Sequence, residues 1–159
     1  MLLYHGSNVL VSKPKIIRPS KTLDFGAGFY LTSSYEQAQK WARNQTLRRN
    51  EGKPVVSVFE VEEQELFSLN VMKFQRADKS WLAIITANRT NISHQMEYDV
   101  IIGPVADDDT FPVISDYIRG KYTEKEALSR LLPRRFKDQY VFKTAKSLET
   151  LKFLRGDDC

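Results

Sequence analysis

Short apolar segments typical of strands are interspersed along this chain with helix-like segments, in no regular alternation. A doubly wound sheet is built from a repeated strand–helix unit, so this irregular order favours an α+β fold instead. The 159 residues suffice to bury one core, and we expect a single domain spanning residues 1–159. Strands are predicted at Leu2–His5, Phe29–Thr32, Pro54–Val61, Tyr98–Ile102, Tyr140–Thr144 and Leu151–Leu154.

Capping residues mark where the helices begin and end. The pattern Ser33-x-x-Glu36 is a capping box that opens a helix to about Asn50, with Gly52 as its stop. Asp78 is predicted to cap another helix, and Thr123-x-x-Glu126 is a second capping box. Helical segments are also predicted at 111–119, 124–132 and 145–150, residues 66–74 fit either a strand or a short helix, and residues 13–28 are a loop.

Composition and charge exclude several classes of protein. Hydrophobic residues make up 42% and charged residues 28% of the chain, which are ordinary globular values and argue against disorder. Cys159 is the only cysteine, so an internal disulfide and a multi-cysteine metal site are both excluded, and no metal-ligand spacing appears elsewhere. The sequence lacks an apolar run of about 18 residues and a signal-peptide pattern. We therefore expect a cytoplasmic protein with no metal and no membrane partner.

Three short motifs carry residues suited to chemistry. They are Tyr4-His5-Gly6-Ser7, Asp24-Phe25-Gly26-Ala27-Gly28-Phe29-Tyr30 and Asp138-Gln139-Tyr140. The Gly-x-Gly lacks the third glycine of a dinucleotide fingerprint and the Gly-Lys of a phosphate-binding loop. Structural interpretations stay open beside the functional ones. A lone histidine such as His5 is often a hydrogen-bonded core residue, and Trp41 also fits the apolar stripe of its helix with Ala38 and Ala42.

Together these motifs resemble those of the His–Tyr–Glu class of ADP-ribosyltransferases, which includes diphtheria toxin and the poly-ADP-ribose polymerases. The combination of His-Gly, Gly-x-Gly-Phe-Tyr and Gln is also similar to a small bacterial family of uncharacterised transferase-like domains. The resemblance covers nearly the whole chain and implies two small mixed sheets around an NAD cleft, with flanking helices. It also implies that NAD is the substrate and is cleaved at its nicotinamide–ribose bond, through a cationic ribose as in glycoside hydrolysis.

The first motif would hold two parts of NAD. By resemblance, His5 bonds the adenosine ribose and the backbone of Gly6 pairs with the nicotinamide amide. A glycine suits that position because a side chain would keep the ligand away from the backbone. Ser7 and, from the second motif, Gly28 complete the expected cofactor-binding residues.

Two aromatic residues would hold the nicotinamide ring. In the family, aromatic side chains at the positions of Tyr30 and Trp41 sandwich this ring. The bound ring is cationic, so an electron-rich aromatic face is a suitable partner. Ala38 stands where the better-known enzymes often have a serine that bonds the amide.

The third motif departs from the active enzymes. Gln139 occupies the position of their glutamate, so it can hydrogen-bond the ribose but brings no negative charge. Asp138 would point to the opposite face of a strand and is a poor substitute. The expected catalytic residues are then His5, Tyr30 and Gln139. The expected function is transfer of a single ADP-ribose to a macromolecule, either protein or nucleic acid, by a toxin or effector with a cognate inhibitor protein as partner.

Two alternatives stay open. One is a non-catalytic module that binds NAD or ADP-ribose in the same cleft, which Gln139 favours. The other is a basic nucleic-acid-binding domain, for which the net charge of +4 is a weak indication. Consumption of NAD separates the transferase from the module, and binding of NAD separates both from the nucleic-acid-binding domain.

Overall fold

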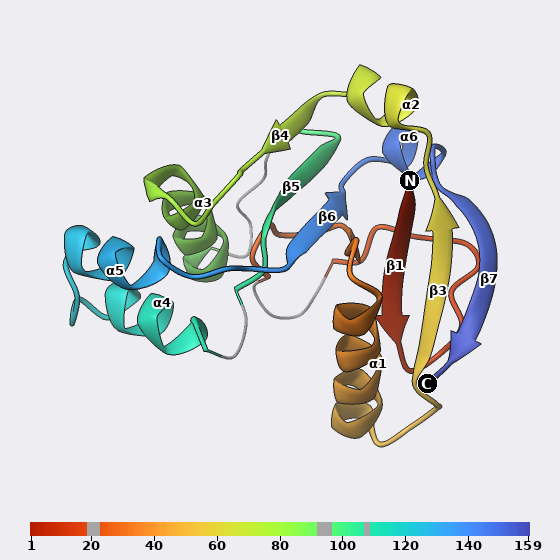
Figure 1. Cartoon of the computed structure of the whole chain (residues 1–159), viewed down its shortest axis with the longest axis horizontal. Helices are drawn as coiled ribbons and strands as arrows, with labels where there is room; N and C mark the ends of the chain where they lie inside the picture. Colours follow the sequence, from red (N-terminus) through yellow and green to blue (C-terminus); the bar gives the residue numbers. More distant parts are fainter. Residues whose placement is uncertain (19–22, 92–96, 107–108) are drawn as a thin grey trace.

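The fold consists of two small sheets with helices packed against them. The computed structural model describes residues 1–18, 23–91, 97–106 and 109–159 (Figure 1). Strands β1 (Leu2–Ser7), β3 (Val55–Glu60) and β7 (Lys152–Asp158) form an antiparallel sheet in the order β1-β3-β7. Strands β2 (Phe29–Leu31), β6 (Asp138–Phe142), β5 (Val100–Pro104) and β4 (Val71–Lys73) form a mixed sheet in the order β2-β6-β5-β4. The prediction of an α+β fold with two small sheets is confirmed.

The helices of the described residues fall into three groups in space. They are α1 (Tyr35–Arg49), α2 (Glu63–Ser68), α3 (Lys79–Thr90), α4 (Phe111–Ile118), α5 (Glu124–Leu131) and α6 (Ala145–Leu148). Figure 1 shows α1 beside β1 and β3, whereas α3, α4 and α5 gather at the far end of the mixed sheet and α2 and α6 lie at one end of the strands. Within the described ranges, no helix is long and apolar enough to cross a bilayer.

A two-residue junction joins the two sheets. The N–H of Tyr4 donates to the carbonyl of Thr32 at 2.9 Å, and the N–H of Thr32 donates back to the carbonyl of Tyr4 at 3.0 Å. Residues that oppose each other across an antiparallel pair project from the same face, and side chains alternate along each strand. The face of β1 that carries Tyr4 and Gly6 therefore continues into the face that carries Tyr30 and Gln139.

Helices cover both halves of this continuous face, which we call the helical face. On the antiparallel sheet, Ala38 of α1 packs against Val56 and Val58. On the mixed sheet, α3, α4 and α5 pack around Val141 in a larger cluster that includes Trp81, Ile85, Ile114, Ala127 and Leu131. The opposite faces of the two sheets share another core, built from Leu3, Phe29, Leu31, Phe59, Tyr140 and Phe142.

The start of α1 differs from the predicted capping box. Ser34, not Ser33, is the N-cap, and its hydroxyl accepts from the N–H of Gln37 at 3.3 Å. Ser33 instead bonds Asp138 of β6, through its N–H to Oδ1 at 2.9 Å and through its hydroxyl to Oδ2 at 2.5 Å. A long-range carboxylate therefore competes with the local cap, and the helix begins one residue later.

Other boundaries also shift from the predicted positions. Asn50, in the left-handed conformation with φ 51°, ends α1 two residues before Gly52. Strand β6 begins at Asp138 rather than Tyr140, and residues 66–74 resolve into the end of α2 followed by β4. The predicted caps Asp78 and Thr123 are confirmed, since each side chain accepts from the backbone three residues ahead. The predicted loop 13–28 contains a bridge between Ile17 and Gly28, and its residues 19–22 lie outside the described ranges.

Candidate functional site

Gly6 lies under α1 and at an open strand edge. A Cβ at Gly6 would overlap the backbone of Ala38 and Ala42, so the glycine allows α1 to pack directly on β1. Backbone groups alternate sides along a strand, and Tyr4 directs its N–H and C=O toward Thr32. Gly6, two residues on, presents its own N–H and C=O to the same edge beyond the junction, where no described residue bonds them. This edge offers one donor and one acceptor to an amide.

Trp41 lies on the flank of α1 that faces this edge. At about 3.6 residues per turn, Tyr35 and Trp41 fall on opposite flanks of the buried line Ala38–Ala42. Tyr35 packs edge-on against Tyr4 with 5.2 Å between ring centroids, and its hydroxyl donates to Asp157 of β7 at 3.2 Å. Tyr35 therefore marks the flank of α1 that faces β7, which lies beyond β3 from β1. Trp41 is on the other flank, which faces the junction. Its indole is partly exposed.

His5 ties the first motif to the second from behind the helical face. Its Nδ1 lies 2.7 Å from the carbonyl oxygen of Tyr30, and its ring stacks on Phe29 with centroids 4.4 Å apart. A carbonyl only accepts, so this bond requires a proton on Nδ1. Burial lowers the pKa of His5 below its usual 6.5, although the bond to Tyr30 acts in the opposite direction. The ring is therefore neutral at pH 7, with Nε2 as an acceptor. Ser7 shares this face, and its hydroxyl donates to Asn8 at 3.5 Å.

Tyr30 holds the loop that precedes its own strand. Its hydroxyl donates to the carbonyl of Gly26 at 2.6 Å and accepts from the N–H of Phe25 at 3.2 Å. Burial, and next the negative charge of Asp24, raise the pKa of this phenol well above its usual value. The ring packs against the cluster beneath α3 and α4. The hydroxyl is thus a structural group, whereas the aromatic ring lies on the helical face.

Lys143 holds the same loop and was missed by the sequence interpretation. Its ammonium donates to the carbonyls of Phe25 at 2.5 Å and Ala27 at 2.7 Å. Burial lowers its pKa to about 8. No local pattern identifies such a group, because a lysine after an apolar strand usually marks the return to solvent. Gly28 closes the loop, and a Cβ there would press on the side chain of Val141.

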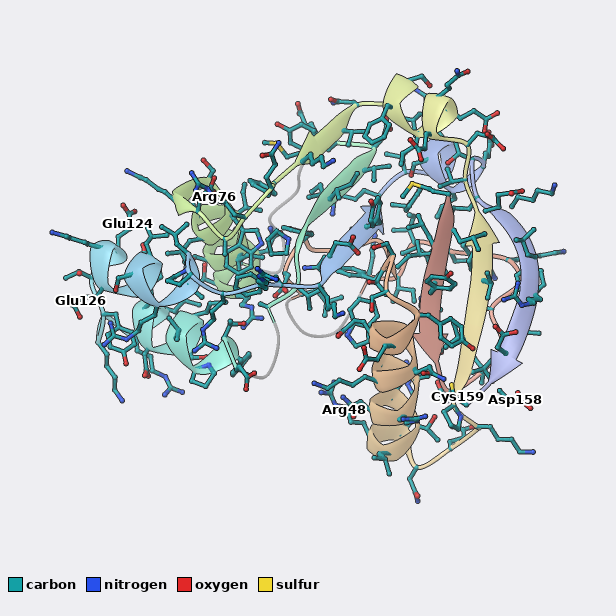
Figure 2. The ribbon with its side chains drawn as sticks, viewed as in Figure 1. Arg48, Arg76, Glu124, Glu126, Asp158 and Cys159 are labelled. Carbon is teal, nitrogen blue, oxygen red and sulfur yellow. The ribbon has the colours of Figure 1, made fainter. Side chains whose placement is uncertain are left out.

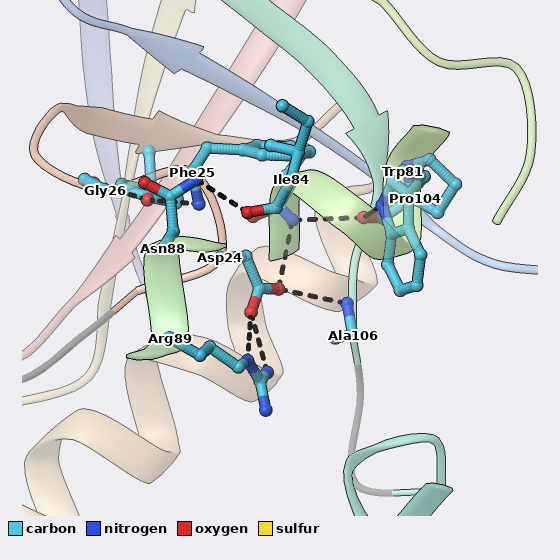
Figure 3. Close-up of polar contacts among 11 residues, drawn as sticks. Asp24, Phe25, Gly26, Trp81, Ile84, Asn88, Arg89, Pro104 and Ala106 are labelled. Carbon is cyan, nitrogen blue, oxygen red and sulfur yellow. Dashed lines mark hydrogen bonds and ion pairs between the residues drawn. The ribbon is translucent and has the colours of Figure 1, made fainter. Parts of the chain in front are cut away.

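Gln139 is turned into the protein. Its side chain is 3% exposed, and Nε2 donates to the carbonyl of Pro104 at 3.1 Å and to Oδ2 of Asp24 at 3.3 Å. Figure 3 shows Asp24 between Arg89 of α3 and the backbone of Ala106. Arg89 donates to Oδ1 from Nη2 at 2.6 Å and from Nε at 2.9 Å, and the N–H of Ala106 donates to Oδ2 at 3.2 Å. The second motif includes Asp24 without giving it a role, and no sequence pattern singles out Arg89.

The predicted residues fall into three places. Gly6, Tyr30 and Gln139 share the helical face, with Trp41 on the flank of the helix above it. His5 and Ser7 lie on the other face of β1, and Gly28 lies in the loop below Tyr30. Asp138, as predicted, points away from Gln139, and it fixes the junction by accepting from Thr32 and Ser33. The carboxylate of Asp24, which bonds Gln139, brings a charged group with several donors to the helical face.

Comparison with known proteins identifies one family. No curated protein and no solved structure matches the chain. Residues 1–153 match the family described as a protein of unknown function, DUF3990. That match covers almost the entire sequence and includes all three motifs. The chain therefore belongs to the DUF3990 family.

Proposed function

We propose that this chain is an NAD-dependent mono-ADP-ribosyltransferase that modifies a macromolecule, and that its helical face forms the NAD cleft of an ADP-ribosyltransferase fold. One observation carries the proposal. The open edge at Gly6, the flank of α1 with Trp41, and the ring of Tyr30 lie on one continuous face between two groups of helices. Nicotinamide requires one amide donor, one amide acceptor and an aromatic surface, and this face supplies all three.

Each residue then has a defined part in the reaction. Gly6 pairs with the nicotinamide amide while Tyr30 and Trp41 hold its ring. The bond between nicotinamide and the ribose C1′ breaks with its electrons leaving on nicotinamide, so positive charge develops on the ribose. A nucleophilic atom of the acceptor then attacks C1′ and loses its proton. His5 lies behind the helical face and holds the carbonyl of Tyr30 in place, and Gln139 bonds the ribose that is attached to nicotinamide.

A non-catalytic module that binds NAD or ADP-ribose is the second candidate. The observation in its favour is that the amide of Gln139 is buried and bonded to protein groups rather than directed to solvent. A hydrogen-bonding amide without charge holds a ribose but stabilises a cation poorly. This candidate predicts NAD binding without release of nicotinamide.

A basic nucleic-acid-binding domain is supported less well. Figure 2 shows Arg76 near Glu124 at the end of the molecule that carries α3 and α5, and Arg48 and Asp158 in the half that carries α1 and β7. All four residues are exposed, so each of these two regions projects charges of both signs. A nucleic-acid surface usually gathers its positive charge on one face.

One experiment separates the three candidates. The full chain is incubated with NAD labelled in the adenylate part, together with separate pools of protein, RNA and DNA, while free nicotinamide is measured. The proposed function predicts release of nicotinamide and label on one pool. NAD that binds in calorimetry but is never consumed would identify the module, and absence of NAD binding would reject both. Transfer to RNA or DNA should fall steeply with salt, as phosphate contacts do.

A further inference from the structure

The carboxylate of Asp24 is surrounded by donors on the helical face. Arg89 binds Oδ1 through two nitrogens, and Oδ2 accepts from Ala106 and Gln139. The side chains of Asp24 and Arg89 are 12% and 14% exposed, so this ion pair is largely shielded from water. Arg89 is held in turn over the ring of Phe111, 4.8 Å from its centroid. The charge of Asp24 is therefore fixed in position.

This geometry explains why position 139 carries an amide. The Nε2 of Gln139 points at two acceptors, Oδ2 of Asp24 and the carbonyl of Pro104. A glutamate in the same rotamer would place an oxygen where this nitrogen is, about 3.3 Å from a carboxylate oxygen and without a proton to share. Two carboxylates at that separation do not both ionise readily. An ionised aspartate at position 24 therefore disfavours an ionised glutamate at position 139.

We propose that Asp24 is a positioning residue of the transferase site. It fixes the amide of Gln139 by accepting from its nitrogen, and supplies, from behind that amide, the negative charge that a glutamate carries in the enzymes which the motifs resemble. The inference rests on the proposed function. Among the residues that the structure describes, the charged and titratable groups that face this carboxylate are Arg89 from α3 and the phenol of Tyr30 from β2. Lys143 bonds the carbonyl of the next residue, Phe25.

A consequence follows for Gln139→Glu. The new carboxyl group beside Asp24 has a raised pKa in the folded protein, whereas its pKa in the unfolded chain is ordinary. A raised folded pKa stabilises the protein below the unfolded pKa, and this contribution is lost as pH rises through the folded pKa. The variant should therefore lose stability between about pH 5 and pH 8 relative to the wild type.

The first measurement uses stability alone and needs no NAD. Urea midpoints are compared at about pH 5 and pH 8 for the wild type, Gln139→Glu and Asp24→Asn/Gln139→Glu. The matched control is Asp138→Asn/Gln139→Glu, which removes the neighbouring carboxylate on the other face of β6. We expect the extra fall of the midpoint in Gln139→Glu to vanish with Asn at position 24 and to persist with Asn at position 138. An equal fall in both double variants would overturn the proposal.

The second measurement tests the role in turnover. Asp24→Asn should lower kcat about tenfold to hundredfold while the affinity for NAD stays within about threefold, because a charge near the developing cation acts on the transition state. Adding Gln139→Glu to Asp24→Asn should restore kcat to within about threefold of the wild type. If the wild type consumes NAD and Asp24→Asn has the same kcat, the positioning role is rejected and the proposed function stands. A wild-type protein that neither binds nor consumes NAD would reject the proposed function as well.

If Asp24→Asn does not fold, the single variant Gln139→Glu still tests the role of Asp24 through the pH dependence of its kcat. Its carboxyl group is protonated at low pH and ionises as pH rises, so its kcat relative to the wild type should rise between about pH 6 and pH 8.5. A flat ratio across that range would mean that Asp24 does not control the group at position 139.

Discussion

Replacing Tyr30 separates the two roles that the structure gives this side chain. The hydroxyl bonds the backbone of Phe25 and Gly26, and the ring lies on the helical face where we place nicotinamide. Tyr30→Phe removes only the hydroxyl, whereas Tyr30→Ala removes both groups. The two variants should therefore affect stability and NAD binding in different proportions.

The structure sets the size of each effect. Without the hydroxyl, one buried N–H and one carbonyl lose their partner, and each such loss costs about 1–3 kcal/mol. We expect Tyr30→Phe to lower the free energy of unfolding by about 2–6 kcal/mol. Its affinity for NAD should change by less than about threefold, because the ring remains. Tyr30→Ala should weaken NAD binding about tenfold to a hundredfold, since deleting an aromatic stacking partner removes about 1–3 kcal/mol.

The assay pairs urea unfolding with calorimetric titration of NAD into protein that is shown to be folded by circular dichroism. Tyr140→Phe is the matched control, because Tyr140 lies on the other face of the mixed sheet and its hydroxyl makes no hydrogen bond within the described part of the chain. Its free energy of unfolding should stay within about 0.5 kcal/mol of the wild type. A Tyr30→Phe variant as stable as this control would refute the role of the hydroxyl. An unchanged NAD affinity in folded Tyr30→Ala would refute the placement of nicotinamide.

Three further changes test the surroundings of the site. His5→Gln should lose less stability than the wild type as pH falls from about 6.5 to 5, because a histidine with a lowered folded pKa stabilises the protein only above that range. Equal pH profiles of the two proteins in urea unfolding would contradict this. Gly6→Ala should cost about 1–3 kcal/mol or more, because the methyl group meets the backbone of Ala38, and an unchanged urea midpoint would refute that contact. Lys143→Met should abolish the rise in stability that the wild type gains above its folded pKa of about 8, where the unfolded chain still binds the proton. A persistent rise in Lys143→Met would assign it to another group.

Local patterns predicted the elements well where the chain decides its own conformation. The valine-rich segment at 54–61 is β3, and the caps Asp78 and Thr123 bond the backbone as expected. The capping box at Ser33 failed because Asp138, 105 residues away, takes both polar groups of that serine. Such competition between a local cap and a distant carboxylate leaves no trace in a window of neighbouring residues.

The glycines show why a correct residue type does not identify a role. Gly6 was assigned to ligand approach, and the structure adds that α1 packs on the same atom. Gly28 was assigned to NAD, and its missing side chain also makes room for Val141. Close approach by a ligand and close approach by the protein both require the absence of a Cβ, so the sequence alone does not distinguish them.

The environment of Gln139 was beyond sequence analysis for a related reason. Strand alternation predicts correctly that Asp138 and Gln139 face opposite ways. The partners of Gln139 come from Asp24, 115 residues earlier, and from Pro104 on the adjacent strand, and Asp24 is fixed by Arg89 from a helix. Only the assembled fold brings these four residues together.

The buried position of Gln139 is compatible with ribose binding if bonds are exchanged rather than lost. Its amide nitrogen has two protein acceptors, and a ribose hydroxyl that replaces the carbonyl of Pro104 returns a hydrogen bond of similar strength. That carbonyl still accepts from Trp81, and Asp24 keeps its bonds from Gln139 and Arg89 in the exchange. The free energy required is then the difference between two neutral hydrogen bonds, about 1 kcal/mol or less, not the much larger cost of exposing an ion pair. A glutamate at this position would instead have to separate from a like charge, so the amide is the residue that lets this site admit a ribose while its carboxylate stays in place.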